Sequence, residues 1–319
     1  MMLARVADAL YWTGRYIERA ENVARLLMMT SEFCVELDGL DESLAQTEWN
    51  GVLRVLLGAQ APAIHYAPEC GGSLPFLRTL LTNGLTPASV RYSVERARDN
   101  ARSVGEALTR EVYTSLNALG QELQRLHDDG LRDPASGIEA VHAVHIRILT
   151  LLGAIEHTLT RDSGWTYLKL GEAMERAQRT ATILRLKLPP LLIGDEHDGT
   201  LRYAAVRQLL LSLASLENFR RVHGAALNGE SVGRFLLFDT AAPRSLACCT
   251  CRMLGAYESL PKSDPGVVAA GRAVGRLHAE LTYEEETVMS GAIDGSFFDG
   301  ALARLYEAHE ATTRHRRPD

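Results

Sequence analysis

The chain has 319 residues, of which 46% are hydrophobic and 23% charged, a balance typical of a globular protein that excludes a disordered or fibrous one. Its 34 basic and 40 acidic residues give a net charge of −6, so no overall positive field attracts phosphate backbones, and nucleic acid is not an expected partner. We recognise neither a signal peptide nor an uninterrupted apolar stretch long enough to span a membrane, and therefore expect a cytoplasmic protein without membrane attachment.

Apolar residues recur at helical spacing along the whole chain. The first predicted helix contains Val6, Leu10, Ile17, Val23 and Leu27, with charged residues between them and no proline. Similar spacing predicts further helices at 49–58, 88–127, 136–160, 165–187, 200–227, 231–238, 243–259, 265–290 and 297–311. Loops are expected where proline and glycine gather, at 62, 68–75, 128–134, 189–199 and 261–266. No segment alternates as a strand would, so the predicted class is all-α.

One sequence motif occurs twice. Residues 14–20, Gly-Arg-Tyr-Ile-Glu-Arg-Ala, are matched by residues 171–177, Gly-Glu-Ala-Met-Glu-Arg-Ala, 157 positions later. A second match, between 87–89 and 243–245, lies at a separation of 156. Two matches at nearly one separation indicate a duplication. We therefore predict a helical bundle of two diverged, pseudo-two-fold-related repeats, 1–135 and 136–319, that share one core.

A polar stripe on the first predicted helix holds the main candidate site. Its members are three or four residues apart and so share one face of the helix: Tyr11, Arg15, Glu18, Asn22 and Arg25. Gly14 is small enough to let another helix approach. Consecutive helical residues point about 100° apart, so Glu18 cannot pair with Arg19. The same holds for Glu175 and Arg176.

Two interpretations of these Glu-Arg pairs stay open. In the first, they form a structural network, with Glu18 paired to Arg176 and Glu175 paired to Arg19. In the second, they form a pocket for a carboxylate- or phosphate-bearing ligand, because arginine offers a planar fork of donors to such groups. The residues expected to bind that ligand are Tyr11, Arg15, Arg19, Asn22 and Arg176.

Further candidate anion-binding residues lie on the helix predicted from Pro87 onward, in a polar cluster of Arg98, Asn100, Arg102, Glu111 and Asn117. Arg98 and Arg102 share a face, and their like charges repel unless an anion or carboxylates lie nearby; exposed, solvated arginines are the alternative. Pro87 and Pro243 are interpreted as the first residues of helices, with Thr86 as an N-cap. Arg244 at the second of these helix starts could assist anion binding, and capping alone is the alternative.

Metal and nucleophile motifs are weak. Glu139, His142 and His145 have a spacing found in di-iron bundles, but no second copy of the motif exists, and we interpret them as ordinary helix-surface residues. Cysteines 248, 249 and 251 diverge on a helix and cannot all reach one zinc ion, so we expect buried small residues. No glycine-rich phosphate loop or nucleophile elbow occurs, and the prediction is no metal and no cofactor of its own.

Residues 5–22, Arg-Val-Ala-Asp-Ala-Leu-Tyr-Trp-Thr-Gly-Arg-Tyr-Ile-Glu-Arg-Ala-Glu-Asn, closely resemble the opening signature of the Alpha-E family, bacterial helical proteins named for a Glu-Arg motif. The resemblance continues through 86–90, 97–102, the second Glu-Arg helix and 243–245. Glu172 differs from the arginine usual at its position, and Tyr113 from a common tryptophan.

The resemblance implies partners and a function class. Alpha-E proteins are neighbours or fusion partners of a circularly permuted ATP-grasp protein and often of a transglutaminase-like protease. ATP-grasp proteins activate carboxylates as acyl phosphates and pass them to amines, so ATP and Mg would enter through the partner. The implied function is a component of a peptide- or amide-forming or protein-modification system that binds the substrate or the ligase. The alternatives are an enzyme acting on an amide or ester with Glu18 or Glu175 as general acid or base, and a structural adaptor.

Overall fold

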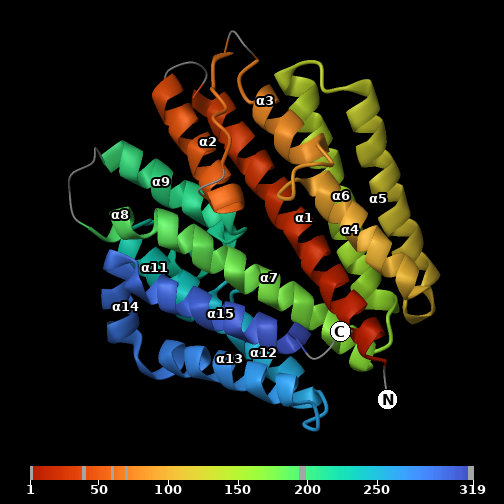
Figure 1. Ribbon diagram of the computed structural model, residues 1–319. Helices are drawn as coiled ribbons and strands as arrows, with labels where there is room; N and C mark the ends of the chain where they lie inside the picture. Colours follow the sequence, from red (N-terminus) through yellow and green to blue (C-terminus); the bar gives the residue numbers. More distant parts are fainter. Residues whose placement is uncertain (1–2, 38–40, 59–60, 69–70, 194–198, 315–319) are drawn as a thin grey trace. The chain divides into compact units, whose positions relative to one another are not determined.

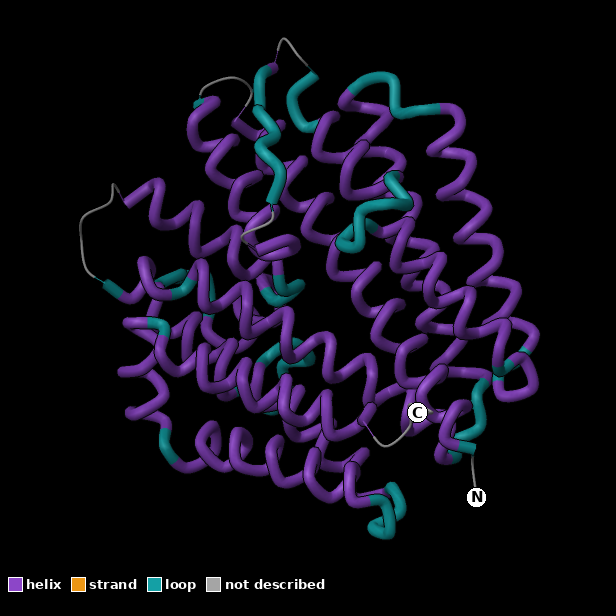
Figure 2. The backbone as a smooth tube through the Cα atoms, in the orientation of Figure 1, coloured by secondary structure: helices purple, strands orange, loops and turns teal. Residues whose placement is uncertain are grey.

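The computed structural model describes residues 3–37, 41–58, 61–68, 71–193 and 199–314, and over these ranges it contains helices and connecting loops but no strand (Figure 2). The all-α prediction is confirmed. The chain divides into two compact units, Met1–Glu172 and Ala173–Asp319. The division falls inside one helix, α7 (Ser163–Lys187), which contributes to both units.

The first unit is built around α1 (Ala4–Leu37). The elements that follow are α2 (Glu42–Leu57), α3 (Leu74–Leu77), the π-helical turn η3 (Arg78–Thr82), α4 (Val90–Ser103), the 3-10 turn η4 (Gly105–Ala107), α5 (Arg110–Asp129) and α6 (Pro134–Thr158). Helix α1 packs against α2, α4 and α6, and α5 packs against α4 and α6 (Figure 1). Because neighbours cover α1 on several sides, its buried residues extend around most of the helix rather than along one stripe.

Helix α1 crosses the first part of α7 at two glycines. A Cβ atom added to Gly14 would lie 2.0 Å from the carbonyl oxygen of Leu168, and one added to Gly171 would lie 2.0 Å from that of Tyr11. No side chain fits at either position, so the two backbones are in direct contact. The close approach expected at Gly14 is therefore present, and Gly171 makes the corresponding approach from the other helix.

The second unit contains the remainder of α7 and eight further helices among its described residues. These are α8 (Pro189–Leu192), α9 (Gly199–Ser212), α10 (Leu216–His223), α11 (Gly229–Phe238), α12 (Leu246–Ser259), α13 (Pro265–Tyr283), α14 (Glu285–Asp294) and α15 (Ser296–Arg314). Helix α13 packs against both α12 and α15 (Figure 1). The buried hydroxyls of Tyr257 and Thr312 share a hydrogen bond of 2.8 Å that joins α12 to α15.

Three helices predicted as continuous are interrupted. The one expected at 88–127 ends at Ser103 and restarts at Arg110, so the cluster around Arg98 is divided between α4 and α5. The one expected at 200–227 breaks before Ser215, where Ala214 has a φ of 48°. The one expected at 265–290 breaks at Glu284. Periodicity missed these breaks because apolar spacing resumes on both sides of each short interruption.

The predictions that helices start at Pro87 and Pro243 are wrong. Each proline lies in the turn before a helix, a position that also suits proline. The N-caps are Ser89 and Ser245 instead. The Ser89 hydroxyl accepts from the Tyr92 amide at 3.0 Å and donates to the Asn83 carbonyl at 2.6 Å. The Ser245 hydroxyl accepts from the Cys248 amide at 3.0 Å and donates to the Asp239 carbonyl at 2.5 Å. The two turns, 156 residues apart in the sequence, have the same hydrogen-bond pattern.

Helix α6 is unusually apolar. Among the described residues it is the one helix that, by length and composition, could cross a membrane, and a third (33%) of its most apolar window is buried in the protein. Core helices of soluble proteins meet the same criterion. Its packing against α1 and α5 shows that one face belongs to the core of the first unit.

Candidate functional site

The polar stripe on α1 is buried. Tyr11, Arg15, Glu18, Asn22 and Arg25 are each at most 5% exposed. Helical spacing placed them on one face, as predicted, but that face is covered by protein rather than open to solvent. Burying an unpaired charge costs several kcal/mol, so a stable fold requires partners for these groups.

Four residues of α1 form a hydrogen-bonded chain. The Asn22 side-chain amide donates to the Glu18 Oε1 atom at 3.1 Å and accepts from Arg25 Nη2 at 2.6 Å. Arg25 Nη1 in turn lies 2.5 Å from both carboxylate oxygens of Glu21. Asn22 therefore connects the carboxylate of Glu18 to Arg25, which neutralises the carboxylate of Glu21.

Glu21 was not among the predicted site residues. It is 2% exposed and contacts a second helix, since its Oε1 lies 3.3 Å from Nε2 of His145 on α6. One turn earlier on α6, His142 Nε2 lies 2.8 Å from Oε1 of Glu32. The sequence signal for Glu21 was its position four residues before Arg25, an ion-pair spacing. The two histidines thus face glutamates of α1, and within the described residues no three candidate ligands converge to hold a metal ion.

The arginines of the first motif lie beside aromatic rings. Arg15 Cζ is 5.4 Å from the centroid of the Trp12 ring, and Arg19 Cζ is 5.2 Å from that of Tyr16. Such cation–π contacts hold a guanidinium in a defined position. Burial raises the pKa of the Tyr16 hydroxyl, and the positive charge of Arg19 partly opposes the shift.

The second Glu-Arg pair is also buried: Glu175 is 3% and Arg176 is 8% exposed on α7. Glu175 Oε1 lies 3.8 Å from Nη2 of Arg179, four residues later, as Glu18 contacts Asn22 four residues later on α1. The reciprocal pairing of Glu18 with Arg176 and of Glu175 with Arg19 stays a prediction.

Glu172, which departs from the expected arginine, is paired within its own helix. Its Oε2 lies 2.5 Å from Nζ of Lys169. The second copy of the motif therefore carries a buried carboxylate where the first carries the buried guanidinium of Arg15. The two copies differ in charge at this position, and any ligand they bind would meet different groups at each.

The remaining predicted residues occupy other places. Arg98 on α4 donates from Nε to the Asn117 side-chain oxygen on α5 at 3.1 Å. Arg102, one turn further, is exposed and lies 3.5 Å from an Asp99 carboxylate oxygen, as the solvated alternative predicted. Arg244 lies in the turn before α12, where its carbonyl accepts from the Thr180 hydroxyl at 3.1 Å.

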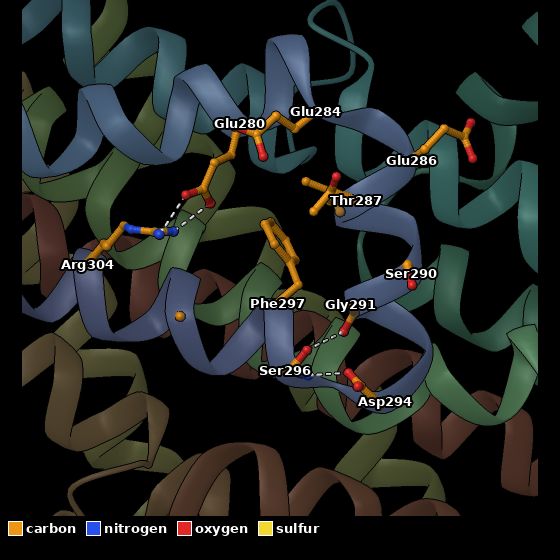
Figure 3. A pocket seen from close by; sticks show the side chains of 12 residues that line it. Glu280, Glu284, Glu286, Thr287, Ser290, Gly291, Asp294, Ser296, Phe297 and Arg304 are labelled. Carbon is orange, nitrogen blue, oxygen red and sulfur yellow. Dashed lines mark hydrogen bonds and ion pairs between the residues drawn. The ribbon is translucent and has the colours of Figure 1, made fainter.

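A cavity of about 740 Å³ in the second unit lies between the end of α13, α14 and the start of α15 (Figure 3). Arg304 on its wall is paired with Glu280 at 2.6 Å, and Asp294 accepts from the Ser296 amide at 2.9 Å. Glu284 and Glu286 also line it, and Glu286 is paired with Arg234 at 3.0 Å, so Glu284 and Asp294 are the lining carboxylates without an ion pair among the described residues. This excess of negative charge disfavours the anionic ligand predicted from the sequence, and none of the predicted site residues lies here.

Comparison with known protein families shows to which family the chain belongs. The model of the Alpha-E family, described as a predicted alpha-helical domain with a conserved ER motif, matches residues 2–315. The chain belongs to the Alpha-E family. Both Glu-Arg pairs of this Alpha-E protein lie within the matched region.

Its curated relatives are much longer. Uncharacterized proteins of Mycobacterium bovis and Mycobacterium tuberculosis are 26% identical over 326 residues, which cover 95% of this chain and 34% of each relative. This Alpha-E chain thus spans about a third of the length of the curated relatives it matches. No solved structure matches the chain.

Proposed function

We propose that this Alpha-E protein is a component of a peptide- or amide-forming or protein-modification system, in which it acts with an ATP-grasp ligase. It binds the carboxylate- or phosphate-bearing substrate of that ligase, or the ligase itself. The ligase supplies ATP and Mg, and a transglutaminase-like protease is a further candidate partner. The partners follow from the Alpha-E resemblance, and the site and the relatives support the role of a binding component.

One observation carries the proposal. The part of the mycobacterial proteins that matches this chain is 34% of their length, so an Alpha-E unit occurs in one polypeptide with other segments. Segments fused in one protein commonly act on the same process, because fusion raises their effective concentration for each other. Where the chain is separate, the same partner would be bound non-covalently.

The buried network of α1 supports an organising role over a catalytic one. Glu18 is 0% exposed and accepts a hydrogen bond from Asn22. A general acid or base must come within hydrogen-bond reach of the substrate proton. The alternative of an enzyme that uses Glu18 therefore requires opening of α1 from its neighbours.

A purely structural adaptor is the other alternative, since Arg25, Asn22 and Glu21 satisfy one another within the helix. In that case replacement of Arg19 or Arg176 reduces stability and leaves partner binding unchanged. Thermal melts measured beside a binding assay separate the two roles, because a binding role predicts loss of affinity in a variant that still folds.

The deciding experiment is to co-express the chain with an ATP-grasp protein from the same organism, the partner that the family resemblance implies, test for co-purification, and follow ATP-dependent amide formation by each protein alone and by both. Activity that needs both proteins is the expected result. A ligase equally active without the Alpha-E chain, together with no complex, would contradict the proposal. Wild-type turnover by Glu18→Gln and Glu175→Gln variants would exclude the catalytic alternative.

We also propose that the chain arose by duplication, as repeats 1–135 and 136–319 with a pseudo-two-fold relation and a joint core. The reciprocal approaches at Gly14 and Gly171 support this, because Leu168 and Tyr11, which receive them, are also 157 positions apart. The matching serine caps at Ser89 and Ser245 support it independently.

A further inference from the structure

Arg98 is a cation whose described partner is a neutral amide. Its Nε donates to the Asn117 side-chain oxygen at 3.1 Å, and across the described residues the structure gives this guanidinium no carboxylate partner. The other arginines near it differ. Arg91 lies 2.8 Å from Glu95, and Arg125 lies 2.5 Å from Glu122. Arg98 therefore keeps the N–H groups of its two terminal nitrogens for another acceptor.

A glycine of α5 allows the Arg98 side chain to pack directly against the backbone of that helix. A Cβ atom on Gly120 would lie 2.6 Å from both Cδ and Nη1 of Arg98. Gly120 stands inside α5, where glycine is about 0.5–1 kcal/mol less favourable than alanine. With Asn117 holding Nε, the glycine leaves the guanidinium fixed on the backbone of α5. A fixed guanidinium loses little entropy when it binds an oxyanion.

The Arg98 side chain lines a groove of about 490 Å³ between α4 and α5. This volume lies within the range of small-molecule sites, about 300–1,000 Å³. The wall consists of Glu95, Arg98, Gly120, Gln121, Gln124 and Arg125. Glu95 and Arg125 are already paired, as described above, so Arg98 supplies the uncompensated positive charge of the wall.

We propose that this groove binds a small molecule or peptide end bearing a single carboxylate, held by the fork of Arg98. A carboxylate accepts two parallel N–H bonds from a guanidinium, and its one charge matches the one uncompensated cation. A phosphate dianion also fits the fork, but its second negative charge exceeds the one uncompensated cation of the groove wall. The inference rests on the proposed function for its class of substrate and places the anchor of that substrate on α4, apart from the α1 stripe.

The test uses the whole chain without any ligase, so its failure is distinct from failure of the co-expression experiment. N-acetylglycine serves as the carboxylate probe, and inorganic phosphate and chloride are compared at equal ionic strength. The NMR signals of the Arg98 Nε–H and the Gly120 amide are followed during each titration. The expected result is a saturable shift with N-acetylglycine, at least tenfold weaker with phosphate and absent with chloride.

Variants test whether the NMR shift arises from binding of the probe to Arg98. Arg98→Gln should abolish binding, and Arg98→Lys, which keeps the charge but not the fork, should weaken it at least tenfold. Gly120→Ala keeps Arg98 but displaces its guanidinium and should weaken binding similarly. Arg102→Gln is the control, because Arg102 is exposed, one turn further along α4, and paired with Asp99.

Several results would overturn the proposal. They are the absence of a saturable shift in the wild-type protein, an unchanged affinity in Arg98→Gln, and an equal loss in Arg102→Gln. Preferential binding of phosphate would overturn the carboxylate assignment. Circular dichroism of each variant establishes that it is folded, and Arg98→Lys remains decisive if Gly120→Ala does not fold.

Discussion

His145 on α6 places its Nε2 atom 3.3 Å from Oε1 of Glu21 on α1, and the two residues are 124 positions apart in the chain. Glu21 is 2% exposed and also binds Arg25 at 2.5 Å. One buried carboxylate thus joins an ion pair within α1 to a contact between two helices. Glu21 is therefore a buried polar contact within the α1–α6 packing.

The first prediction concerns Glu21. Glu21→Gln removes the buried negative charge that Arg25 Nη1 and His145 Nε2 contact, which should lower the free energy of unfolding by about 3 kcal/mol. Glu32→Gln is the matched control, because the His142–Glu32 pair is 42% and 40% exposed at its side chains and should contribute less than about 1 kcal/mol. Urea denaturation measures both. Equal losses of stability in the two variants would show that the buried pair contributes no more than the exposed one.

The second prediction concerns the helix crossing. Gly14→Ala and Gly171→Ala each place a Cβ atom 2.0 Å from a backbone carbonyl oxygen, which forces the helices apart and should lower stability by about 3 kcal/mol or more. Gly153→Ala on α6 is the control. Nothing lies within 4 Å of a Cβ at that position, so the variant should gain about 0.5–1 kcal/mol from better helix propensity. Thermal melts that rank the three variants otherwise would contradict the crossing.

The third prediction concerns thiol reactivity. Burial, together with the nearby Glu48 carboxylate, raises the pKa of the Cys34 thiol to about 12. At pH 8 only about one Cys34 thiol in ten thousand is then the reactive thiolate. Cys251, by contrast, is exposed on α12. Peptide mapping after iodoacetamide treatment at pH 8 should find Cys251 alkylated and Cys34 intact, and comparable alkylation of both in the native protein would refute this.

The fourth prediction concerns the helix caps. Ser89→Ala and Ser245→Ala each remove a hydroxyl that caps one helix and binds a carbonyl six residues earlier, so each should cost about 1–2 kcal/mol. Ser259→Ala removes an exposed hydroxyl that donates to the Ala256 carbonyl and should change stability by less than about 0.5 kcal/mol. Denaturation curves measure all three. Very different losses of stability in Ser89→Ala and Ser245→Ala would show that the same hydrogen-bond pattern does not contribute equally at the two positions.

Helical class and the polar stripe were predictable because both depend on local spacing. The long apolar period of α1 and the three- and four-residue steps from Tyr11 to Arg25 leave little choice of structure. Helix ends were less predictable. A proline three residues before α4 resembles a helix start, and only the three-dimensional turn shows that Ser89 provides the cap.

The partners of the polar residues could not be predicted, because they come from distant parts of the chain. Nothing near Glu21 in the sequence points to His145, and nothing near Arg98 points to Gly120. Arg102 differs, because its partner Asp99 lies only three residues earlier, whereas the amide and the glycine beside Arg98 come from α5. A single sequence contains these residues but not their distances.

The position of α7 has a practical consequence for dividing the gene. The boundary between the compact units falls between Glu172 and Ala173, in the middle of this 25-residue helix, so no cut there leaves either piece with an intact α7. A cut in the loop at 159–162 keeps the helix whole on the second fragment. The first fragment then exposes the backbone of Gly14, and the second exposes the Gly171 surface that fits against it. We expect these two fragments to be poorly soluble separately and to reassemble when co-expressed, which would make the chain usable as a split reporter.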